Sequence, residues 1–491
     1  MRLGQWVKHF LVYGTGIILM NLLPALMIPI YTYRITPSMY GVLELLNRSQ
    51  EVLIVILSFG LGSAVATFYQ MERDNPEGQK AVYSTSVQFV AVFSLIIVLC
   101  LLVLSSGISR LLFGSVSYRM AIVLILLSTY FEVLFQSGIL YFQSELRSSL
   151  YVSIYAARSI LSIFLNLILV FWWRWGLIGI LTATLIQTSI SGIAVVAYMF
   201  QGTGFRFQRK VIGHLLRFGG PLVIGGFAMF ILNNGDRYFL KSCWSSADVG
   251  IYGIGYRLGA IGLAVVLYPF MKIWSVTMVD ISRRPDGHKE LSQIATYLIA
   301  ACIFTNLALA LFGPYLVEAI TERSYWGANR LVPVIGLAYV FYAWSVIMDA
   351  SFYVTKKTVY KICDTTLAAG VILLLYWWLI PRYEMMGAAW ATVGGFASFA
   401  GIKSVISQRV LRIPFEFGRI GCLFGIGIIL YLIGAHMPTF SIVPALVARS
   451  AVTIAFPIIL WLGGFMTPNE RRAVEEYWDI VRVRYLGGEQ T

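Results

Sequence analysis

Charged residues are scarce in this chain of 491 residues, because Asp, Glu, Lys and Arg together make up only 12% of it. Soluble globular domains carry about a quarter charged residues, so this composition excludes a soluble protein. Hydrophobic residues, in contrast, make up 58% of the chain. We therefore expect an integral membrane protein.

Cysteine and histidine are also scarce, with five cysteines and four histidines. The cysteines are scattered without a CxxC pair, which favours neither a disulfide framework nor a zinc site. The sequence also lacks the GxSxG, HExxH and phosphate-loop signatures of several large enzyme classes. We therefore expect no metal, no cofactor and no enzymatic activity.

Apolar stretches long enough to cross a bilayer recur along the whole chain. A spanning helix needs about 20 apolar residues, whereas strand barrels show weak alternating segments of about ten. The pattern therefore predicts an all-α polytopic membrane protein with fourteen transmembrane helices. Their expected ranges are 10–34, 40–69, 83–106, 118–142, 150–172, 176–200, 215–240, 249–274, 291–312, 328–354, 359–380, 384–406, 418–435 and 442–465.

The lysines and arginines of the short connecting segments predict the orientation. If the N-terminus is cytoplasmic, most of the 37 lie on the cytoplasmic side, with clusters in 201–217, 272–289 and 403–419. We therefore expect both termini to face the cytoplasm. The formal net charge of +14 is then mainly a topology signal, and nucleic acid is not an expected partner.

An internal repeat relates the two halves of the chain. Three matches carry it: HFLVYG from His9 with HLLRFG from His214, MYGVLELLNRSQ from Met39 with DVGIYGIGYRLG from Asp248, and GILTAT from Gly179 with GAAWAT from Gly387. Their nearly constant offset indicates duplication. Each unit has six helices, so both units enter the membrane from the same side and the repeat is parallel.

The repeat predicts two six-helix lobes that face each other across a central cavity, with two further helices outside the repeat. The expected boundaries are an N-terminal lobe at 1–200, a basic cytoplasmic linker at 201–217, a C-terminal lobe at 218–406, helices 13 and 14 within 407–466, and a cytoplasmic tail at 467–491. Thr467 to Glu470 have the spacing of a capping box, which predicts an amphipathic helix in the tail.

Two arginines occupy matched positions in the two halves. Arg48 and Arg257 each follow a glycine, Gly41 and Gly250, by seven residues, and each lies about 14 Å into its helix at 1.5 Å per residue. A charge near the bilayer midplane costs about 2.5 to 3.5 kcal/mol on insertion scales, so it is usually retained for pairing or function. Arginine is well suited to bind phosphate oxygens, and a pyrophosphate headgroup fits two of them.

The two arginines differ in their local partners. Glu44 and Glu51 lie four residues before and three residues after Arg48, on the same helix face, and can neutralise it. Arg257 has no acidic residue at those positions. Arg257 is therefore the stronger candidate for contact with an anionic substrate, whereas a structural ion pair competes with that role for Arg48.

Seven charged residues are candidates for further cavity or coupling sites: Glu44, Glu51, Glu132, Arg158, Asp236, Arg237 and Asp349. Glu132 can accept a proton, balance an arginine or serve as a structural carboxyl. Arg158 can line the inner mouth or extend its side chain to the interface. Asp236 and Arg237 are expected at the outer end of their helix, and Asp349 near the cytoplasmic end of its helix.

Two further charged positions have simpler expected roles. Asp364 is expected to pair with Lys361, three residues before it on the same helix. Arg449 is expected to be structural, because its helix lies outside the repeat.

The chain resembles the Wzx-type flippases of lipid-linked oligosaccharides, in the polysaccharide-transport branch of the multidrug/oligosaccharidyl-lipid/polysaccharide exporter superfamily. The segments that carry the resemblance are FLVYGTGIILMNLLPALMIPIYTYRITPSMYGVLELLNRSQ, NNGDRYFL from Asn233, and WGLIGILTATLIQ from Trp175. The resemblance covers essentially the whole chain. It implies two six-helix lobes around a V-shaped cavity, and cavity arginines that correspond to Arg48 and Arg257. The arginines that related lipid II flippases carry on helix 1 have no counterpart here.

The resemblance implies that the protein moves a polyprenyl-diphosphate-linked oligosaccharide, such as an O-antigen, capsule or exopolysaccharide repeat unit, across the inner membrane by alternating access. Its expected partners are this substrate, membrane lipids, a coupling ion (proton or sodium), and a polysaccharide polymerase with assembly proteins. A cation-coupled multidrug exporter of the same superfamily is the alternative within transport, although arginines have the wrong sign for cationic drugs. A membrane-embedded glycan polymerase or ligase is the alternative from another class.

Overall fold

The computed structural model describes residues 26–145, 147–357, 359–437 and 441–466. Most of the expected first helix and the expected tail helix lie outside these ranges. Helices form nearly all of the described part, and no strand occurs in it. The α-helices are α2 (Met27–Thr32), α3 (Pro37–Leu57), α4 (Leu61–Met71), α5 (Pro76–Val103), α6 (Ser105–Phe113), α7 (Arg119–Ser144), α8 (Ser148–Asn166), α9 (Gly176–Thr203), α10 (Arg209–Cys243), α11 (Ser246–Gly259), α12 (Tyr268–Ser282), α13 (Gly287–Ile320), α14 (Leu331–Val354), α15 (Tyr360–Val410), α16 (Phe417–Ala435) and α17 (Ile442–Leu462).

Short helical segments of other types connect some of these helices. They are the 3-10 segments Val116–Tyr118 and Arg323–Arg330 and the π-helical segments Leu167–Trp172 and Leu263–Leu267. The helix α6 corrects the sequence prediction, which leaves residues 107–117 between two spans.

Local sequence signals fix the starts of the helices that carry the candidate site. The side chain of Thr36 accepts a hydrogen bond from the backbone N–H of Met39, and Pro37 occupies the first helical position of α3. Ser245 and Asp248 form a reciprocal capping box at the start of α11. Both caps satisfy backbone donors that a helix otherwise leaves without partners.

Eleven helices in the described ranges are long and apolar enough to cross a membrane. The 51 residues of α15 would span about 75 Å at 1.5 Å per residue, more than twice the hydrocarbon thickness of about 30 Å. Glu384 interrupts α15 with a φ of 53° and a ψ of −134°, at the boundary expected between two spans. The total of fourteen spans stays a prediction, because most of the first helix is not described.

The helices that carry Arg48 and Arg257 are both broken, which corrects the expectation of two continuous spans. Phe59 and Gly60 adopt positive φ values of 50° and 65° between α3 and α4. The second helix is broken by the π-helical segment Leu263–Leu267 between α11 and α12. Each helix is thus interrupted on the C-terminal side of its arginine, α3 after Leu57 and α11 after Gly259.

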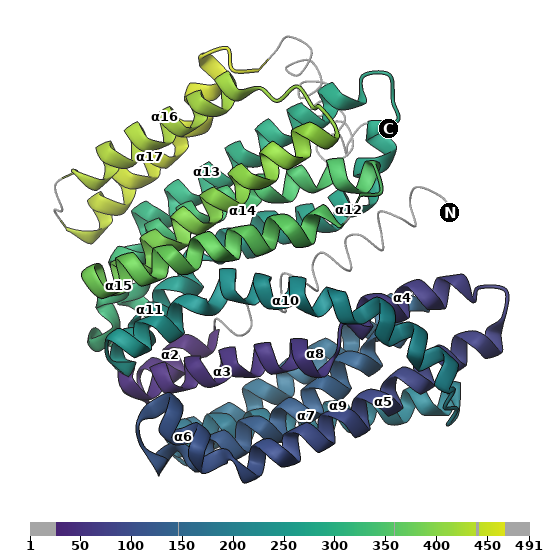
Figure 1. The fold of residues 1–491 in the computed structure, drawn as a ribbon. Helices are drawn as coiled ribbons and strands as arrows, with labels where there is room; N and C mark the ends of the chain where they lie inside the picture. The colour runs from purple at the N-terminus through teal and green to yellow at the C-terminus, as the bar shows by residue number, and fades with distance from the viewer. Residues whose placement is uncertain (1–25, 146, 358, 438–440, 467–491) are drawn as a thin grey trace, which may run out of the picture.

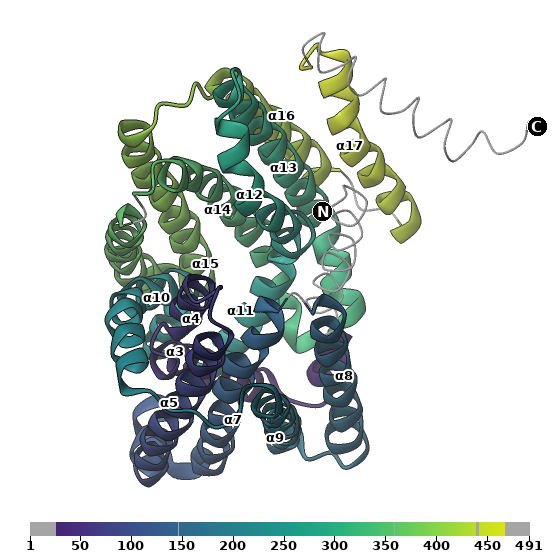
Figure 2. The ribbon, with the colours of Figure 1, turned by 90° about the vertical axis from the view of Figure 1, so that its right-hand side faces the viewer.

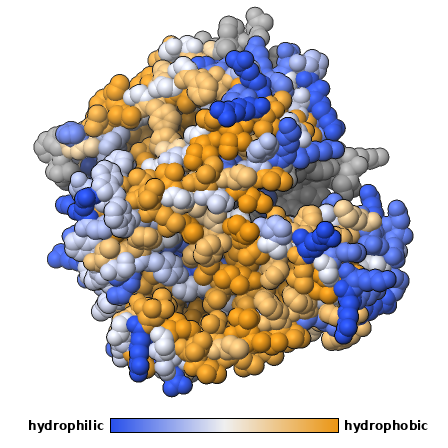
Figure 3. All heavy atoms as spheres, in the orientation of Figure 1, coloured by the Kyte–Doolittle hydropathy of each residue, from blue (hydrophilic) through white to orange (hydrophobic). Residues whose placement is uncertain are grey.

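Figures 1 and 2 show how the helices gather. Helices α5 to α9 lie on one side of α3, α10 and α11, and α12 to α17 lie on the other, with α16 and α17 outermost. Figure 3 shows a broad hydrophobic face between two hydrophilic edges, as expected for a protein whose helices cross a bilayer between those edges. The division into two lobes that the repeat predicts remains an interpretation of this arrangement.

Candidate functional site

The two halves of the repeat meet where α3 crosses α11. A Cβ atom on Gly41 would lie 1.7 Å from the carbonyl oxygen of Ser246, and one on Gly250 would lie 2.1 Å from that of Pro37. Only glycine allows these backbones to approach so closely. The glycines that precede the two arginines in the sequence are therefore the contact point of the two helices.

Three arginines converge on the carboxylate of Glu44, one turn beyond this crossing. The Oε1 atom of Glu44 lies 2.9 Å from Nε of Arg48 and 3.4 Å from Nε of Arg237, and its Oε2 atom lies 3.2 Å from Nη2 of Arg257. We refer to Glu44, Arg48, Arg237 and Arg257 as the arginine cluster. Glu44 has no exposed surface, so its charge is compensated entirely by protein groups.

The repeat makes room for Glu44. Gly253 occupies the position in the second half that corresponds to Glu44 in the first, and a Cβ atom on it would lie 3.1 Å from Cγ of Glu44. A side chain at residue 253 would therefore crowd the carboxylate that binds the arginines. The first half therefore carries a large charged side chain at this position, and the second half carries a glycine that leaves space for it.

The structure corrects the expectation that Arg257 lacks a partner. No acidic residue lies near it on its own helix, as the sequence predicts, but Glu44 of the other half pairs with it. Arg257 also lies over the ring of Tyr40, with 5.6 Å from its Cζ atom to the ring centroid. Its ion pair thus joins the two halves of the repeat.

Arg237 is buried, which corrects its expected place at the outer end of a helix. The helix α10 continues to Cys243, and only 1% of the Arg237 side chain is exposed. Its Nη1 atom lies 2.7 Å from Oδ1 of Asp236, and its guanidinium lies 3.9 Å from the ring centroid of Tyr256. Asp236 also accepts a hydrogen bond of 2.5 Å from the hydroxyl of Tyr252.

Arg48 and Arg257 form the accessible edge of the cluster. Their side chains are 18% and 27% exposed, whereas Arg237 and Glu44 are inaccessible. Glu51, which is 46% exposed, lies 2.6 Å from Nη1 of Arg48. Both expected carboxylate partners of Arg48 are thus present.

Asn234 also belongs to this site, although the sequence does not predict it. Its Oδ1 atom accepts a hydrogen bond of 3.2 Å from Arg48, and its Nδ2 atom donates one of 3.1 Å to Glu51. Asn234 lies within the NNGDRYFL segment, directly before Gly235 and two residues before Asp236. A run of polar residues inside an otherwise apolar helix is the signal that could have found it.

Glu132 and Arg158 lie outside the arginine cluster and form an ion pair with each other. Their side chains are 12% and 17% exposed, and the guanidinium of Arg158 lies 4.1 Å from the ring centroid of Phe135. Three roles are open for Glu132 from the sequence. The structure agrees with one of them, in which its carboxylate balances the charge of an arginine.

Asp349 forms a third charged group, with lysines from both parts of α15. Its Oδ1 and Oδ2 atoms lie 2.8 Å from Nζ of Lys403 and 3.0 Å from Nζ of Lys361. The expected pairing of Asp364 with Lys361 is therefore wrong, because Lys361 binds Asp349 and Asp364 lies 4.0 Å from Lys403. In the described ranges, no group of three or more His, Cys, Asp or Glu residues could hold a metal ion.

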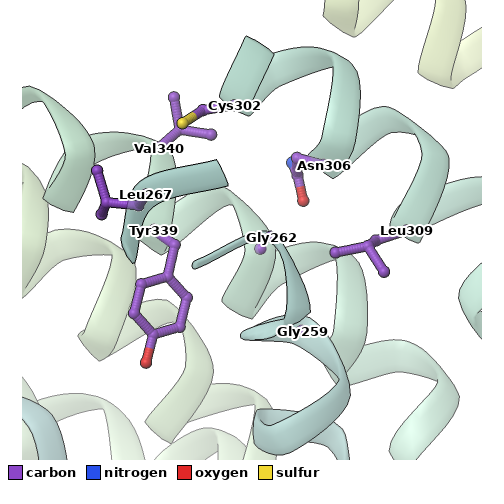
Figure 4. Close-up of a pocket in the computed structure, with 9 residues that line it drawn as sticks. Gly259, Gly262, Leu267, Cys302, Asn306, Leu309, Tyr339 and Val340 are labelled. Carbon is purple, nitrogen blue, oxygen red and sulfur yellow. The ribbon is translucent and has the colours of Figure 1, made fainter. Parts of the chain in front are cut away.

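A small cavity beside α11 is not a substrate site. Figure 4 shows the residues that line it, among them Gly259, Asn306 and Tyr339, but its volume is only about 10 Å³. That volume holds at most about one water molecule. The hydroxyl of Tyr339 donates a hydrogen bond of 3.0 Å to that of Tyr256, which contacts Arg237.

Solved structures share this fold. A lipid II flippase, MurJ, in an inward closed conformation is similar with a TM-score of 0.76 and 12% identity, over 94% of this chain and 100% of that chain. A multidrug resistance MATE family transporter of the MOP superfamily, in an inward-facing conformation, has a TM-score of 0.65 and 16% identity, over 85% and 99% of the two chains. A MOP superfamily transporter from Pyrococcus furiosus has a TM-score of 0.62 and 15% identity, over 85% of this chain and 96% of that chain.

At these identities the similarity establishes the fold, which is that of MOP superfamily transporters. A comparison with curated proteins finds no match. The family described as "Polysaccharide biosynthesis protein" matches residues 6–275, which is more than half of the chain and includes every member of the arginine cluster. The chain is therefore a member of the polysaccharide biosynthesis protein family, with the fold of a flippase-type membrane transporter.

Proposed function

We propose that this protein is a flippase that moves a polyprenyl-diphosphate-linked oligosaccharide from the cytoplasmic to the outer leaflet of the inner membrane. The observation that carries the proposal is the convergence of Arg48, Arg237 and Arg257, from both halves of the repeat, on the single carboxylate of Glu44. In this proposal Arg48 and Arg257 bind the diphosphate, and the glycan crosses through a hydrated cavity between the two lobes while the prenyl chain stays in the bilayer.

Charge explains why the cluster suits a diphosphate. Arg48, Arg237 and Arg257 are balanced by Glu44, Glu51 and Asp236, so the resting site is neutral. A diphosphate carries more negative charge than one carboxylate and offers oxygens to two guanidiniums at once. It can therefore replace Glu44 at Arg48 and Arg257, while Arg237 keeps its contact with Asp236.

The same replacement couples binding to conformational change. The ion pair between Glu44 and Arg257 links α3 to α11, and a bound diphosphate removes that link. The breaks at Phe59–Gly60 and at Leu263–Leu267 then let the outer parts of the two helices move relative to their inner parts. This motion would give the cavity alternating access to the two sides of the membrane.

The remaining parts of the proposal concern context. Both termini face the cytoplasm, and a proton, sodium ion or the membrane potential supplies the driving force. The translocated unit, such as an O-antigen, capsule or exopolysaccharide repeat unit, passes to a polysaccharide polymerase and its assembly proteins.

A cation-coupled multidrug exporter is the second candidate, favoured by the similarity to a multidrug resistance transporter. A cationic drug needs accessible carboxylates without competing cations. Glu44 is inaccessible and bound to arginines, and the more exposed Glu51 is paired with Arg48. These contacts make the site more suitable for an anion than for a cation.

Transport by the purified protein in proteoliposomes tests the proposal against this alternative. A lipid-diphosphate oligosaccharide is placed in the inner leaflet, and its arrival outside is measured with a membrane-impermeant glycosidase. We expect protein-dependent arrival of the intact substrate. Transport of a cationic dye, with no movement of the lipid-linked sugar, would favour the exporter, whereas a lengthened glycan would indicate a polymerase.

A further inference from the structure

A large cavity lies away from the arginine cluster, against α16 and α17, the two helices outside the repeat. Its volume is about 610 Å³, within the usual range of roughly 300 to 1,000 Å³ for ligand sites. Its lining comes entirely from α13 to α17 and the segment directly before α14. In Figure 1, α16 and α17 lie on the side of the molecule opposite to α5, α6 and α7.

Most of the lining is apolar, as a lipid chain requires. It includes aliphatic and aromatic side chains such as Leu307, Val334, Leu337, Trp390 and Ile428. A hydrocarbon chain bound there would contact apolar side chains from several helices at once.

Two arginines line the same cavity, Arg330 at the start of α14 and Arg449 on α17. Neither forms an ion pair with a carboxylate in the part of the chain that the structure describes. The guanidinium of Arg449 lies 4.6 Å from the ring centroid of Tyr315. Arg449, for which the sequence predicts a structural role, thus lines the cavity without a carboxylate partner among the described residues.

Two asparagines add hydrogen-bonding capacity to the lining. The Oδ1 atoms of Asn306 and Asn329 are buried and have no hydrogen-bond partner among the described residues. The Nδ2 atom of Asn329 donates a hydrogen bond of 3.1 Å to Oε1 of Glu318. Buried polar atoms without partners are rare, and a ligand hydroxyl is one way to satisfy them.

Arg449 lies inside the expected hydrocarbon region, close enough to its edge for the side chain to reach the headgroups. It lies seven residues after the start of α17 at Ile442, or about 10 Å into the helix. A long arginine side chain at that depth extends toward the interface and can reach phosphate groups there. Arg330 lies at the same end of the helices, where α14 begins and α16 ends.

We propose that this cavity binds one glycerophospholipid with a net negative headgroup, whose phosphate contacts Arg330 and Arg449 and whose chains lie between α13, α14 and α16. The occupant is a resident lipid and not the transported substrate, because no residue of α3 to α11 lines the cavity. A ligand at this place can stay bound while the two halves of the repeat move. The bound lipid would hold α16 and α17 in contact with α13 and α14.

Native mass spectrometry of the full-length protein tests the proposal. The protein is reconstituted in vesicles of phosphatidylethanolamine and phosphatidylglycerol, extracted in a mild detergent and weighed with its retained lipids. We expect the wild-type protein to retain one phosphatidylglycerol in preference to phosphatidylethanolamine. The double variant Arg330→Gln and Arg449→Gln should lose this preference.

Two further variants keep the test specific. Arg323→Gln is the matched control, because Arg323 is exposed in the same segment as Arg330, lies over Trp326 and does not line the cavity. It should retain phosphatidylglycerol as the wild-type does. Ala435→Phe narrows the cavity without changing charge and should reduce lipid retention. Size-exclusion profiles confirm that each variant is folded.

Three outcomes would overturn the proposal. The first is equal retention of phosphatidylglycerol by the wild-type protein and the double variant. The second is equal retention of both lipids by the wild-type protein. The third is displacement of phosphatidylglycerol by added undecaprenyl diphosphate, which would assign the cavity to the substrate.

Discussion

Glu44 and Arg257 are 213 residues apart in the chain, yet the Oε2 atom of Glu44 lies 3.2 Å from the Nη2 atom of Arg257. The contact depends on the crossing of α3 and α11 at Gly41 and Gly250. It joins the two halves of an internal repeat through a carboxylate that only the first half carries. The interaction that links α3 to α11 is therefore made by the same carboxylate that contacts the candidate substrate-binding arginines.

Replacing Glu44 by Gln should strongly destabilise this conformation. Removing one partner of a buried ion pair costs about 3 to 5 kcal/mol, because the other charge stays buried without compensation. The apparent melting temperature in detergent measures the effect. Glu51→Gln is the matched control, since Glu51 is 46% exposed and an exposed pair contributes about 0 to 1 kcal/mol. Equal melting temperatures for the two variants would contradict the central role of Glu44.

Replacing Gly41 by Ala should force α3 and α11 apart. The added Cβ atom would lie 1.7 Å from a backbone oxygen, which cannot move without its helix. We expect a lower melting temperature and faster labelling of a cysteine introduced at Met39 by a membrane-impermeant reagent. Gly401→Ala is the control, because nothing lies within 4 Å of its added Cβ atom and alanine should stabilise that helix by about 0.5 to 1 kcal/mol. Effects of the same sign at both positions would argue against the tight crossing.

The pair of Glu132 and Arg158 should show energetic coupling. We expect Arg158→Gln and Glu132→Gln each to destabilise the protein, and the double variant to lose less than the sum. Coupling energies of contacting residues are roughly 0.5 to 3 kcal/mol, and unfolding of the four proteins measures them. Strict additivity would show that the pair does not hold the helices together. Loss of proton-driven transport in Glu132→Gln, at unchanged stability, would assign Glu132 a coupling role instead.

Replacing Glu384 by Gly should stabilise the protein. Glu384 has a φ of 53° and a ψ of −134°, a conformation that costs a residue with a side chain about 1 to 3 kcal/mol and that glycine adopts readily. An increased melting temperature is the expected result. Gln293→Gly inside α13 is the control and should cost about 1 kcal/mol. A lower melting temperature for Glu384→Gly would mean that its side chain contributes more than its backbone costs.

The sequence predicts local features of this protein well. Hydrophobic run length is enough to place most of the helices, and the helical spacing of Glu44, Arg48 and Glu51 is enough to predict two ion pairs. These features depend on residues within one or two turns of each other. The family resemblance is confirmed by the match over residues 6–275.

Features that depend on contact between distant segments could not be predicted. The pairing of Arg257 with Glu44 requires the crossing angle of two helices from different halves. Arg237 was placed at a helix end because the polar NNGDR run looks like the end of an apolar span, whereas Asp236, Tyr252 and Tyr256 compensate it in the interior. The breaks near Gly60 and at Leu263–Leu267 occur within apolar runs that read as continuous helices.

The most direct test of diphosphate binding by Arg48 and Arg257 is leaflet translocation of a lipid-diphosphate sugar by Arg257→Ala in proteoliposomes. We expect the translocation rate to fall strongly in Arg257→Ala and to fall also in Arg48→Ala. Arg34→Ala is the control and should stay near the wild-type rate, because the guanidinium of Arg34 lies over Phe171. Binding of a soluble prenyl diphosphate should weaken in the same order. Wild-type translocation by both Arg257→Ala and Arg48→Ala would contradict the assignment of these two arginines to the substrate.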